Sequence, residues 1–316
     1  MKAGLEPTLD ASNLVRDFGT RHAVQGISLT LRRGEVLGLL GPNGAGKTTT
    51  MQMLTGNLAP TSGEVRVCGI DLLERPTEAK ARIGYLPEVP PLYRDSTVDE
   101  YLQFAARLHR IPRAQVAGAV DRAKQRCGLA DMGLRMIGTL SKGYQQRVGI
   151  AQAIVHDPDV VVLDEPTVGL DPNQIREIRG LIRELAAAHS VILSTHILPE
   201  VETVCDRVQI LDGGRVVYTD TIEALRKHRG GHALNVALRN PPPVSVLAAL
   251  PQVKSVEPLG EKRFRLLHEP GTDPTDGLVR RSVELNWGLF ELSPLETSLE
   301  EVFVNLTQRE ETTAAP

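Results

Sequence analysis

Residues 41–48 carry the pattern G-x-x-x-x-G-K-[ST], which is typical of loops that bind the phosphates of a nucleotide. Glycines let the backbone wind around an anion with its N–H groups directed inward, and a helix that follows adds its unpaired amides. Lys47 is suited to the β- and γ-phosphates, and Thr48 to Mg²⁺. The loop residues are Gly41, Pro42, Asn43, Gly44, Ala45, Gly46, Lys47 and Thr48. An ordinary glycine turn is the alternative, but the preceding apolar run 36–40 provides the strand that a phosphate loop requires.

Two adjacent carboxylates, Asp164 and Glu165, follow the apolar run Val160–Leu163. Such a continuous run indicates a strand buried on both faces of a parallel sheet. Successive side chains point to opposite sides, so the two acids can take different roles. Asp164 is suited to Mg²⁺, directly or through water, and Glu165 to polarising an attacking water. Carboxylates also cap strand ends structurally, but ligands bind at the carboxyl ends of strands in such folds, which favours the functional interpretation.

Four further residues have both a structural and a functional interpretation. Ser141 and Gly143 lie at a helix start, where the serine is a good N-cap and where both together make a receptor for a second anion. His196 ends the apolar strand 190–196, either as a satisfied polar residue or as a donor to a γ-phosphate. Phe18 is either an exposed ring that stacks on a base or a core residue. The residue types and their positions are compatible with both interpretations in each case.

The elements that position these residues alternate along the N-terminal part of the chain. The expected strands are residues 8–18, 25–31, 36–40, 64–67, 160–165 and 190–196. The proline-rich residues 82–94 indicate a strand that runs into a stiff loop containing Glu88. A capping box at 97–100 and an amphipathic pattern after Pro112 predict about 50 residues of helix. We expect this helical subdomain, at about 88–155, to be inserted into the phosphate-binding fold, and insertions of that length are usually functional.

Composition and charge exclude several classes of protein. The chain has 316 residues, a net charge of −3 and 24% charged residues, so no basic surface for nucleic acid is indicated. No run approaches the roughly 20 apolar residues of a membrane span, and we expect no secretory signal. If the protein acts at a membrane, another polypeptide must cross it. The three cysteines are far apart, which is typical of reduced, buried thiols.

The C-terminal part of the chain is expected to form a second, smaller domain. Gly230 and Gly231 indicate a linker. Residues 232–308 show the order strand, helix, two strands, helix and strand, which predicts a small α+β domain, followed by a last helix near 299–306. Residues 309–316 are expected to be a disordered tail.

The order of these motifs resembles the ATP-binding subunit of ABC transporters. In sequence, the phosphate loop is followed by the inserted helices, a Leu-Ser-x-Gly-x element at 140–144, the Asp-Glu strand, the Gly-Leu-Asp turn at 169–171 and the histidine. The element at 140–144 separates this family from other P-loop proteins. The resemblance covers residues 8–228. It implies the α/β fold of a P-loop NTPase of ABC type, with an antiparallel β subdomain and an inserted helical subdomain, plus the small C-terminal α+β domain.

The resemblance also implies a role for each site residue, with ATP as the nucleotide and Mg²⁺ as its metal ion. The implied nucleotide-binding residues are Phe18, Gly41, Pro42, Asn43, Gly44, Ala45, Gly46, Lys47, Thr48, Thr49, Ser141 and Gly143. Phe18 would stack on adenine, whereas Ser141 and Gly143 would contact the ATP held by the opposite subunit of a dimer. The implied metal residues are Thr48, Asp164 and Glu88. The implied catalytic residues are Glu165, which acts on water, with Lys47 and His196 at the γ-phosphate.

Several positions depart from the family pattern. Lys142 and Tyr144 stand where the signature element usually has glycine and glutamine, although its serine and second glycine are kept. Glu88 stands where the loop usually has glutamine, which would bring a carboxylate near Mg²⁺ and alter metal affinity or coupling. Phe18 replaces the usual tyrosine and keeps its ring. The implied mechanism is compatible with all of these changes.

The implied partners are a second nucleotide-binding subunit, as in a homodimer, and separate integral-membrane permease subunits, without nucleic acid. The protein would then be cytoplasmic and peripheral on the cytoplasmic face of the membrane. Residues Thr297–Phe303 resemble the tail of ATPases that serve ABC-2-type exporters. An importer subunit shares every ATP-site motif and stays an alternative. A non-transport ABC ATPase is a further alternative, but it would need paired ATPase domains or a long coiled-coil insertion.

Overall fold

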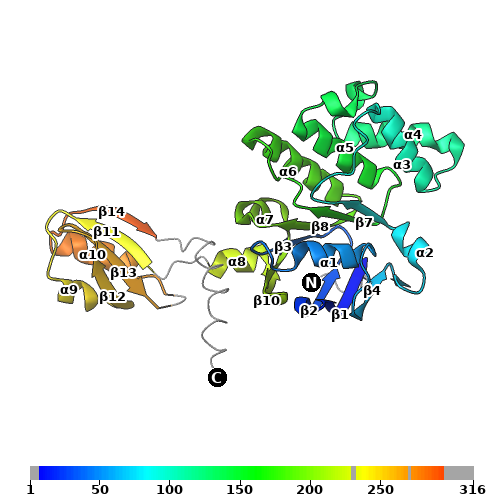
Figure 1. The fold of residues 1–316 in the computed structure, drawn as a ribbon. Coiled ribbons are helices and arrows are strands. Elements are labelled where there is room, and N and C mark those ends of the chain that lie inside the picture. Colours follow the sequence, from blue (N-terminus) through cyan, green and yellow to red (C-terminus); the bar gives the residue numbers. More distant parts are fainter. Residues whose placement is uncertain (1–6, 229–232, 270–271, 295–316) are drawn as a thin grey trace. The chain divides into compact units, whose positions relative to one another are not determined.

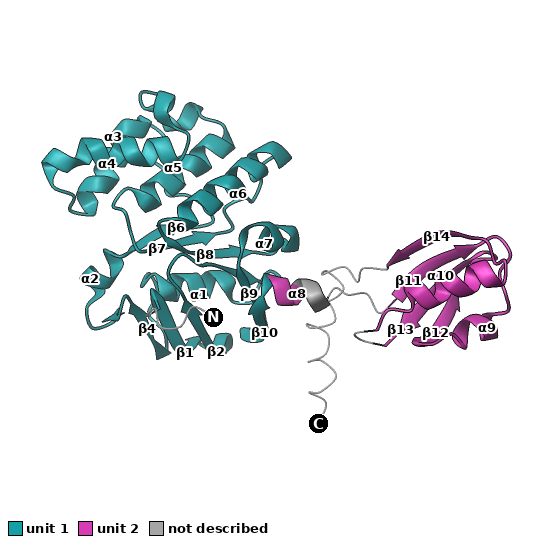
Figure 2. Cartoon of the chain, turned by 180° about the vertical axis from the view of Figure 1, so that it is seen from behind, with its two compact units in different colours: residues 1–222 teal, residues 223–316 magenta. Residues whose placement is uncertain are grey.

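The computed structural model describes residues 7–228, 233–269 and 272–294. The chain divides into two compact units, residues 1–222 and 223–316, which Figure 2 shows in teal and magenta. The domain boundaries predicted from the sequence, 8–228 and 232–308, assign the segment after residue 222 differently and stay predictions. The predicted last helix and tail lie outside the described residues.

A six-stranded sheet forms the centre of the first unit (Figure 1). Its strands, in order across the sheet, are β10 (Arg215–Thr221), β9 (Arg207–Asp212), β3 (Val36–Leu40), β8 (Ser190–Thr195), β7 (Val160–Asp164) and β6 (Ile83–Leu86). All are parallel except β10, which is antiparallel to β9. Strands β3, β7 and β8 are buried along their whole length, as their continuous apolar runs predict. Their carboxyl ends therefore meet at one edge of the sheet.

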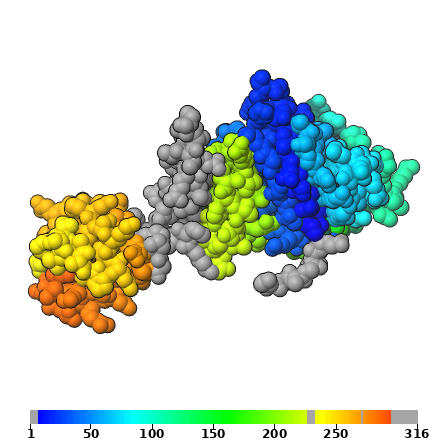
Figure 3. Space-filling model, turned by 90° about the horizontal axis from the view of Figure 1, so that it is seen from below, coloured from blue at the N-terminus to red at the C-terminus, as the bar shows by residue number. Residues whose placement is uncertain are grey.

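An antiparallel sheet makes up a second layer of this unit. Its strands, in order, are β2 (Arg21–Leu31), β1 (Leu9–Phe18), β4 (Ser62–Val67) and β5 (Ile70–Asp71). One apolar cluster joins its inner face to helix α1 (Lys47–Leu54) and to the central sheet. Outward residues alternate with these buried ones, and Figure 3 shows β1 and β2, in blue, on the surface of the unit. The antiparallel β subdomain expected from the resemblance is thus present.

Three helices pack together at the opposite end of the unit from β1, β2 and β4 (Figures 1 and 2). They are α3 (Val98–Leu108), α4 (Arg113–Arg126) and α5 (Lys142–Ile154), with 3₁₀ turns η1 (Ala130–Met132) and η2 (Ile137–Thr139) between the last two. The predicted capping box of α3 is confirmed: Thr97 Oγ1 accepts from the Glu100 amide at 3.2 Å, and a Glu100 carboxylate oxygen accepts from the Thr97 amide at 2.8 Å.

The remaining helices of the first unit are α2 (Pro76–Lys80), α6 (Pro172–Ala186) and α7 (Leu198–Val204). Helix α8 (Ile222–His228) begins at the last residue of the first unit and otherwise belongs to the second. Helix α6 begins after β7, where the Asp171 side chain caps it by accepting from the amides of Asn173 and Gln174 at 2.9 and 3.0 Å. Helix α7 begins shortly after the carboxyl end of β8. Among the residues that the structure describes, no helix combines the length and the apolar character needed to cross a membrane.

The second unit has its own antiparallel sheet and core. Its elements are β11 (Ala233–Leu238), α9 (Val244–Ala248), β12 (Val253–Pro258), β13 (Arg263–His268), α10 (Thr275–Glu284) and β14 (Leu289–Pro294). The strand order is β12-β13-β11-β14. The apolar core includes Leu247 and Leu278 from the helices and Trp287 from the segment before β14. The predicted βαββαβ order is confirmed by this arrangement.

Candidate functional site

The loop between β3 and α1 has a backbone path that only glycine permits at two positions. Gly46, the N-cap of α1, has a φ of 95°, and a Cβ there would lie 2.7 Å from the Ala23 carbonyl oxygen. A Cβ on Gly41 would lie 2.5 Å from the Leu211 carbonyl oxygen. No side chain caps α1, and its first turn contains no acidic residue. The amides at this helix start are therefore well placed to receive an anion.

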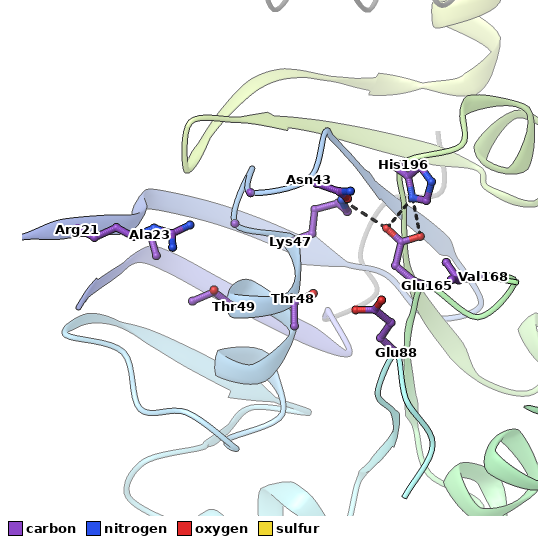
Figure 4. Close-up of a pocket in the computed structure, with 12 residues that line it drawn as sticks. Arg21, Ala23, Asn43, Lys47, Thr48, Thr49, Glu88, Glu165, Val168 and His196 are labelled. Carbon is purple, nitrogen blue, oxygen red and sulfur yellow. Dashed lines mark hydrogen bonds and ion pairs between the residues drawn. The ribbon is translucent and has the colours of Figure 1, made fainter. Parts of the chain in front are cut away.

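A cavity of about 410 Å³ lies at this loop (Figure 4). It is lined by Arg21, Ala23, Asn43, Gly44, Gly46, Lys47, Thr48, Thr49, Glu88, Glu165, Val168 and His196. The β1–β2 hairpin, the phosphate loop, the loop after β6 and the carboxyl ends of β7 and β8 all contribute residues. Nine of the predicted site residues thus meet around one opening, which is large enough for a small ligand.

Lys47 is the buried cation of the cavity. Its ammonium donates to the carbonyl oxygens of Gly41 at 2.8 Å and Pro42 at 3.2 Å, and it lies 3.4 Å from Glu165 Oε1. The loop therefore folds around its own lysine, which is held at the centre of the cradle. An ammonium has three N–H donors, so a phosphate oxygen in the cradle would compete with these oxygen atoms for the donors of Lys47.

Glu165 is held from three sides in a conformation that is rare for a residue with a side chain. Its φ is 47°, in the left-handed region, and its amide donates to the hydroxyl and the carbonyl oxygen of Ser194 at 3.0 and 3.2 Å. Its carboxylate lies 3.0 Å from His196 Nδ1 as well as beside Lys47. Backbone strain of this kind persists only where the surroundings impose it, and it is concentrated at functional sites. The arrangement aims a carboxylate at the cavity, where it can accept a proton from water.

Asp164 precedes Glu165 and is completely buried. Ser194 donates to its Oδ1, whereas Oδ2 is buried and has no hydrogen-bond partner among the described residues. Burial raises the pKa of the Asp164 carboxyl above its ordinary value, the hydroxyls of Ser194 and Thr48 oppose the rise, and the charges of Glu165 and Glu88 add to it. An unpartnered carboxylate oxygen with carboxylates nearby is a site that a cation would stabilise.

Phe18 is 47% exposed at the end of β1, so the core interpretation of this residue is wrong. The guanidinium of Arg16 lies 4.6 Å from the centre of the ring, as in a cation–π contact. Phe18 is not among the residues that line the cavity, but Arg21, its partner in the β1–β2 register, is. The ring is thus available next to the cavity, and its stacking on adenine stays a prediction.

Ser141 and Gly143 lie apart from the cavity, in a separate hollow of about 230 Å³. Ser141 is the N-cap of α5, with its Oγ accepting from the Tyr144 amide at 3.4 Å, so the structural interpretation is confirmed. The Gln174 side chain lies against Gly143, since a Cβ on that glycine would be 2.7 Å from the side-chain amide carbon of Gln174. Within one chain these residues and the phosphate loop form two distinct sites. A second role as an anion site is compatible with this geometry but requires another molecule.

Ser194, which links the ends of β7 and β8, is a site residue that the sequence motifs do not indicate. Its hydroxyl donates to Asp164 and accepts from the Glu165 amide. A polar residue inside an otherwise apolar buried strand was the available signal, because such groups are nearly always hydrogen-bonded. The contribution of Arg21 and Ala23 to the cavity was also missed, since these residues come from a hairpin distant in sequence.

Comparison with known proteins identifies a match between residues 24–168 and the family described as "ABC transporter". The chain is 34% identical over 311 residues to the Nod factor export ATP-binding protein I of Ralstonia nicotianae, with 97% of this chain and 96% of that protein covered. It is 32% identical to the daunorubicin resistance ATP-binding protein DrrA3 of Streptomyces coeruleorubidus, with 92% of each chain covered. Each similarity covers more than 90% of the chain and therefore extends into the second unit.

Among solved structures, the chain is similar to cbiO1 from Clostridium perfringens, part of the ABC transporter complex cbiONQ. The TM-score is 0.64 and the identity 31%, with 70% of this chain and 90% of that chain covered. The similarity is thus found over most of that protein but over a smaller share of this one. The fold class predicted from the sequence is confirmed.

Proposed function

Because the chain belongs to the family of ABC transporter ATP-binding proteins, we propose that it is the ATPase that powers an exporter of the ABC-2 type. ATP binding and hydrolysis for a transporter are the common activity of this family. The observation that carries the export assignment is the similarity to a Nod factor export protein over 97% of the chain. The motifs of the ATP site alone would be shared with importers, so a similarity that includes the second unit supports export over import.

In this proposal, the cavity at the phosphate loop receives the ATP phosphates. The amides at the start of α1 and the Lys47 ammonium contact the phosphate oxygens. Glu165 accepts the proton of the attacking water, and His196, which is 44% exposed and 3.0 Å from Glu165, donates to the γ-phosphate. Phosphoryl transfer requires positioning and charge neutralisation rather than covalent catalysis, and these groups supply both.

Mg²⁺ fits the residues at the edge of this cavity. The Thr48 hydroxyl and the unpartnered Oδ2 of Asp164 would hold it, with Glu88 nearby. Among the described residues, no group of three or more His, Cys, Asp or Glu side chains is arranged to hold a metal ion by itself. Mg²⁺ is usually bound by one or two carboxylates together with substrate phosphates and water, and Asp164 with Thr48 would provide the protein part of such a site. The ion would neutralise charge that develops on the phosphates.

The separation of Ser141 and Gly143 from the cavity supports a dimer in the proposal. Two copies of the chain would bind ATP head to tail, so that the α5 start of one copy completes the cavity of the other. ATP between the copies adds attraction, and its hydrolysis removes that attraction. Separate permease subunits in the membrane would use this closing and opening, with the ATPase peripheral on the cytoplasmic face.

Replacing Glu88 by the family's usual glutamine is expected to raise the Mg²⁺ concentration for half-maximal ATP turnover about fivefold, because one nearby negative charge contributes about 1 kcal/mol to cation binding. The measurement is a Mg²⁺ titration at fixed ATP, accompanied by a titration of nucleotide binding. Asp95→Asn, an exposed charge loss in the same segment, is the matched control. A Glu88→Gln variant with an unchanged or lower Mg²⁺ requirement would show that Glu88 does not act on the metal ion.

Purification of the tagged full chain from detergent-solubilised membranes of its native host is expected to recover a multi-span membrane protein. The physical reason is that export needs a path through the membrane, which the separate permease subunits of this proposal would provide. The measurement is the identification of co-purifying proteins, with tag alone as the control. Recovery of an extracytoplasmic substrate-binding protein together with the permease would favour an importer, and recovery of ribosomes or DNA would contradict transport.

A further inference from the structure

Glu200 on α7 is a buried carboxylate that the ATP site described above does not use. It is 1% exposed, and it is not among the residues that line the cavity in the described part of the chain. Its Oε1 accepts from the Thr167 hydroxyl at 2.5 Å, and its Oε2 accepts from the Thr195 hydroxyl at 2.8 Å. The guanidinium of Arg179, on α6, lies 3.6 Å from Oε1. Both oxygens of one side chain therefore have partners on different segments.

The two hydroxyls belong to the segments that carry the proposed catalytic pair. Thr167 lies two residues after Glu165, in the turn that leads to α6. Thr195 immediately precedes His196 at the end of β8, and its hydroxyl also accepts from the Ile197 amide at 3.0 Å. Figure 1 shows α7 close to β8, which it follows in the sequence. Glu200 is thus a bridge between the turn that follows Glu165 and the end of β8 that precedes His196.

The cost of burying the Glu200 carboxylate favours a defined geometry for this bridge. A buried carboxylate is costly unless its oxygens are hydrogen-bonded and its charge is paired, and the two threonines and Arg179 meet both needs. Glu165, for its part, has a φ of 47° and must be held in place by its surroundings. The Ser194 contacts hold the amide side of Glu165, while the Thr167–Glu200 bond holds the turn that follows it.

We propose that Glu200 is a positioning residue for ATP hydrolysis: it keeps Glu165 and His196 in contact by binding Thr167 and Thr195 simultaneously, without touching the nucleotide. The inference rests on the ATPase assignment and not on the direction of transport. Loss of the bridge would let the turn after Glu165 shift relative to the end of β8. Misplacement of a catalytic group by about 1 Å costs about 100-fold in rate, whereas binding by the phosphate loop should be unaffected.

The test compares Thr167→Val, which removes the hydroxyl but keeps the shape, with Thr167→Ser, which keeps the hydroxyl. In the full chain, Thr167→Val and Glu200→Gln are expected to lower kcat about 10- to 100-fold, as is typical of residues that orient catalytic groups. ATP affinity and KM should stay within about twofold of the parent, since ground-state contacts are retained. Thr167→Ser should retain most of the parental kcat. Glu184→Gln, an equal charge change at an exposed position of α6, is the control.

Three outcomes would overturn the proposal. The first is a folded Glu200→Gln variant with parental kcat. The second is an equal loss of kcat in Thr167→Ser and Thr167→Val. If Glu200→Gln does not fold, this pair of Thr167 variants still tests whether the hydrogen bond to Glu200 is needed for hydrolysis. The third is a loss of ATP affinity that parallels the loss of kcat, because a positioning role leaves binding intact. A parent chain that binds ATP without hydrolysing it would contradict the ATPase assignment itself, and with it this inference.

Discussion

Glu165→Gln is expected to lower kcat for ATP hydrolysis at least about 100-fold, because glutamine keeps the shape of the side chain but cannot accept a proton from water. ATP binding should persist, since the phosphate loop and Lys47 are unchanged. Removing the charge 3.4 Å from the Lys47 ammonium also leaves that cation more available to phosphate. ATP that binds but is not hydrolysed should keep two copies of the chain together. Turnover assays and size-exclusion chromatography with and without ATP provide the measurements.

The matched control for this variant is Glu64→Gln, which removes an equal charge at an exposed position of β4. It should hydrolyse ATP at the parental rate and show no added dimer. If Glu165→Gln turns ATP over like the parent, Glu165 is not the catalytic carboxylate. If it is inactive but elutes as a monomer with ATP, hydrolysis is assigned correctly and the ATP-dependent dimer is not.

Ser141→Arg is expected to block turnover, with kcat reduced at least about 100-fold, while each monomer still binds ATP. Ser141 lies in its own hollow, outside the cavity of its own chain, so a larger side chain there should not disturb the phosphate loop. It would instead occupy the surface on which the second copy must place its nucleotide. Loss of the α5 N-cap costs only about 1 kcal/mol, which is small compared with the stability of a domain. Ser141→Asn, which keeps a capping side chain, is the control.

Mixing Ser141→Arg with Glu165→Gln gives a sharper test of the same composite site. In a head-to-tail dimer of the two variants, one site combines an intact Glu165 with an intact Ser141, and the other site carries both defects. ATP turnover should therefore reappear in the mixture although each variant alone is inactive. A mixture that stays inactive, or a Ser141→Arg variant that hydrolyses ATP normally, would contradict the proposal that each site is built from two copies.

Local sequence patterns predicted many of the strands and helices of this protein and most of the residues of its candidate site. The strand, glycine loop and helix start at 36–48, the capping box at Thr97 and the buried strand that ends in Asp164 and Glu165 all rest on interactions between residues close in sequence. Periodicity, caps and glycine conformations act over that range, so they can be interpreted without a tertiary structure. Motif order then identified the family and the fold class, because the spacing of several such local features is far more specific than any one of them.

The tertiary structure decided how these pieces meet. The β7–β8 register places Asp164 beside Ser194, and it is this pairing that holds the Glu165 amide and brings His196 to the carboxylate. The exposure of Phe18, the separation of Ser141 from the phosphate loop and the Glu200 bridge were decided in the same way. These contacts join segments that are distant in sequence, and most of them depend on sheet register and helix packing. No local propensity encodes register across a parallel sheet, because it is set only when the whole hydrophobic core is formed.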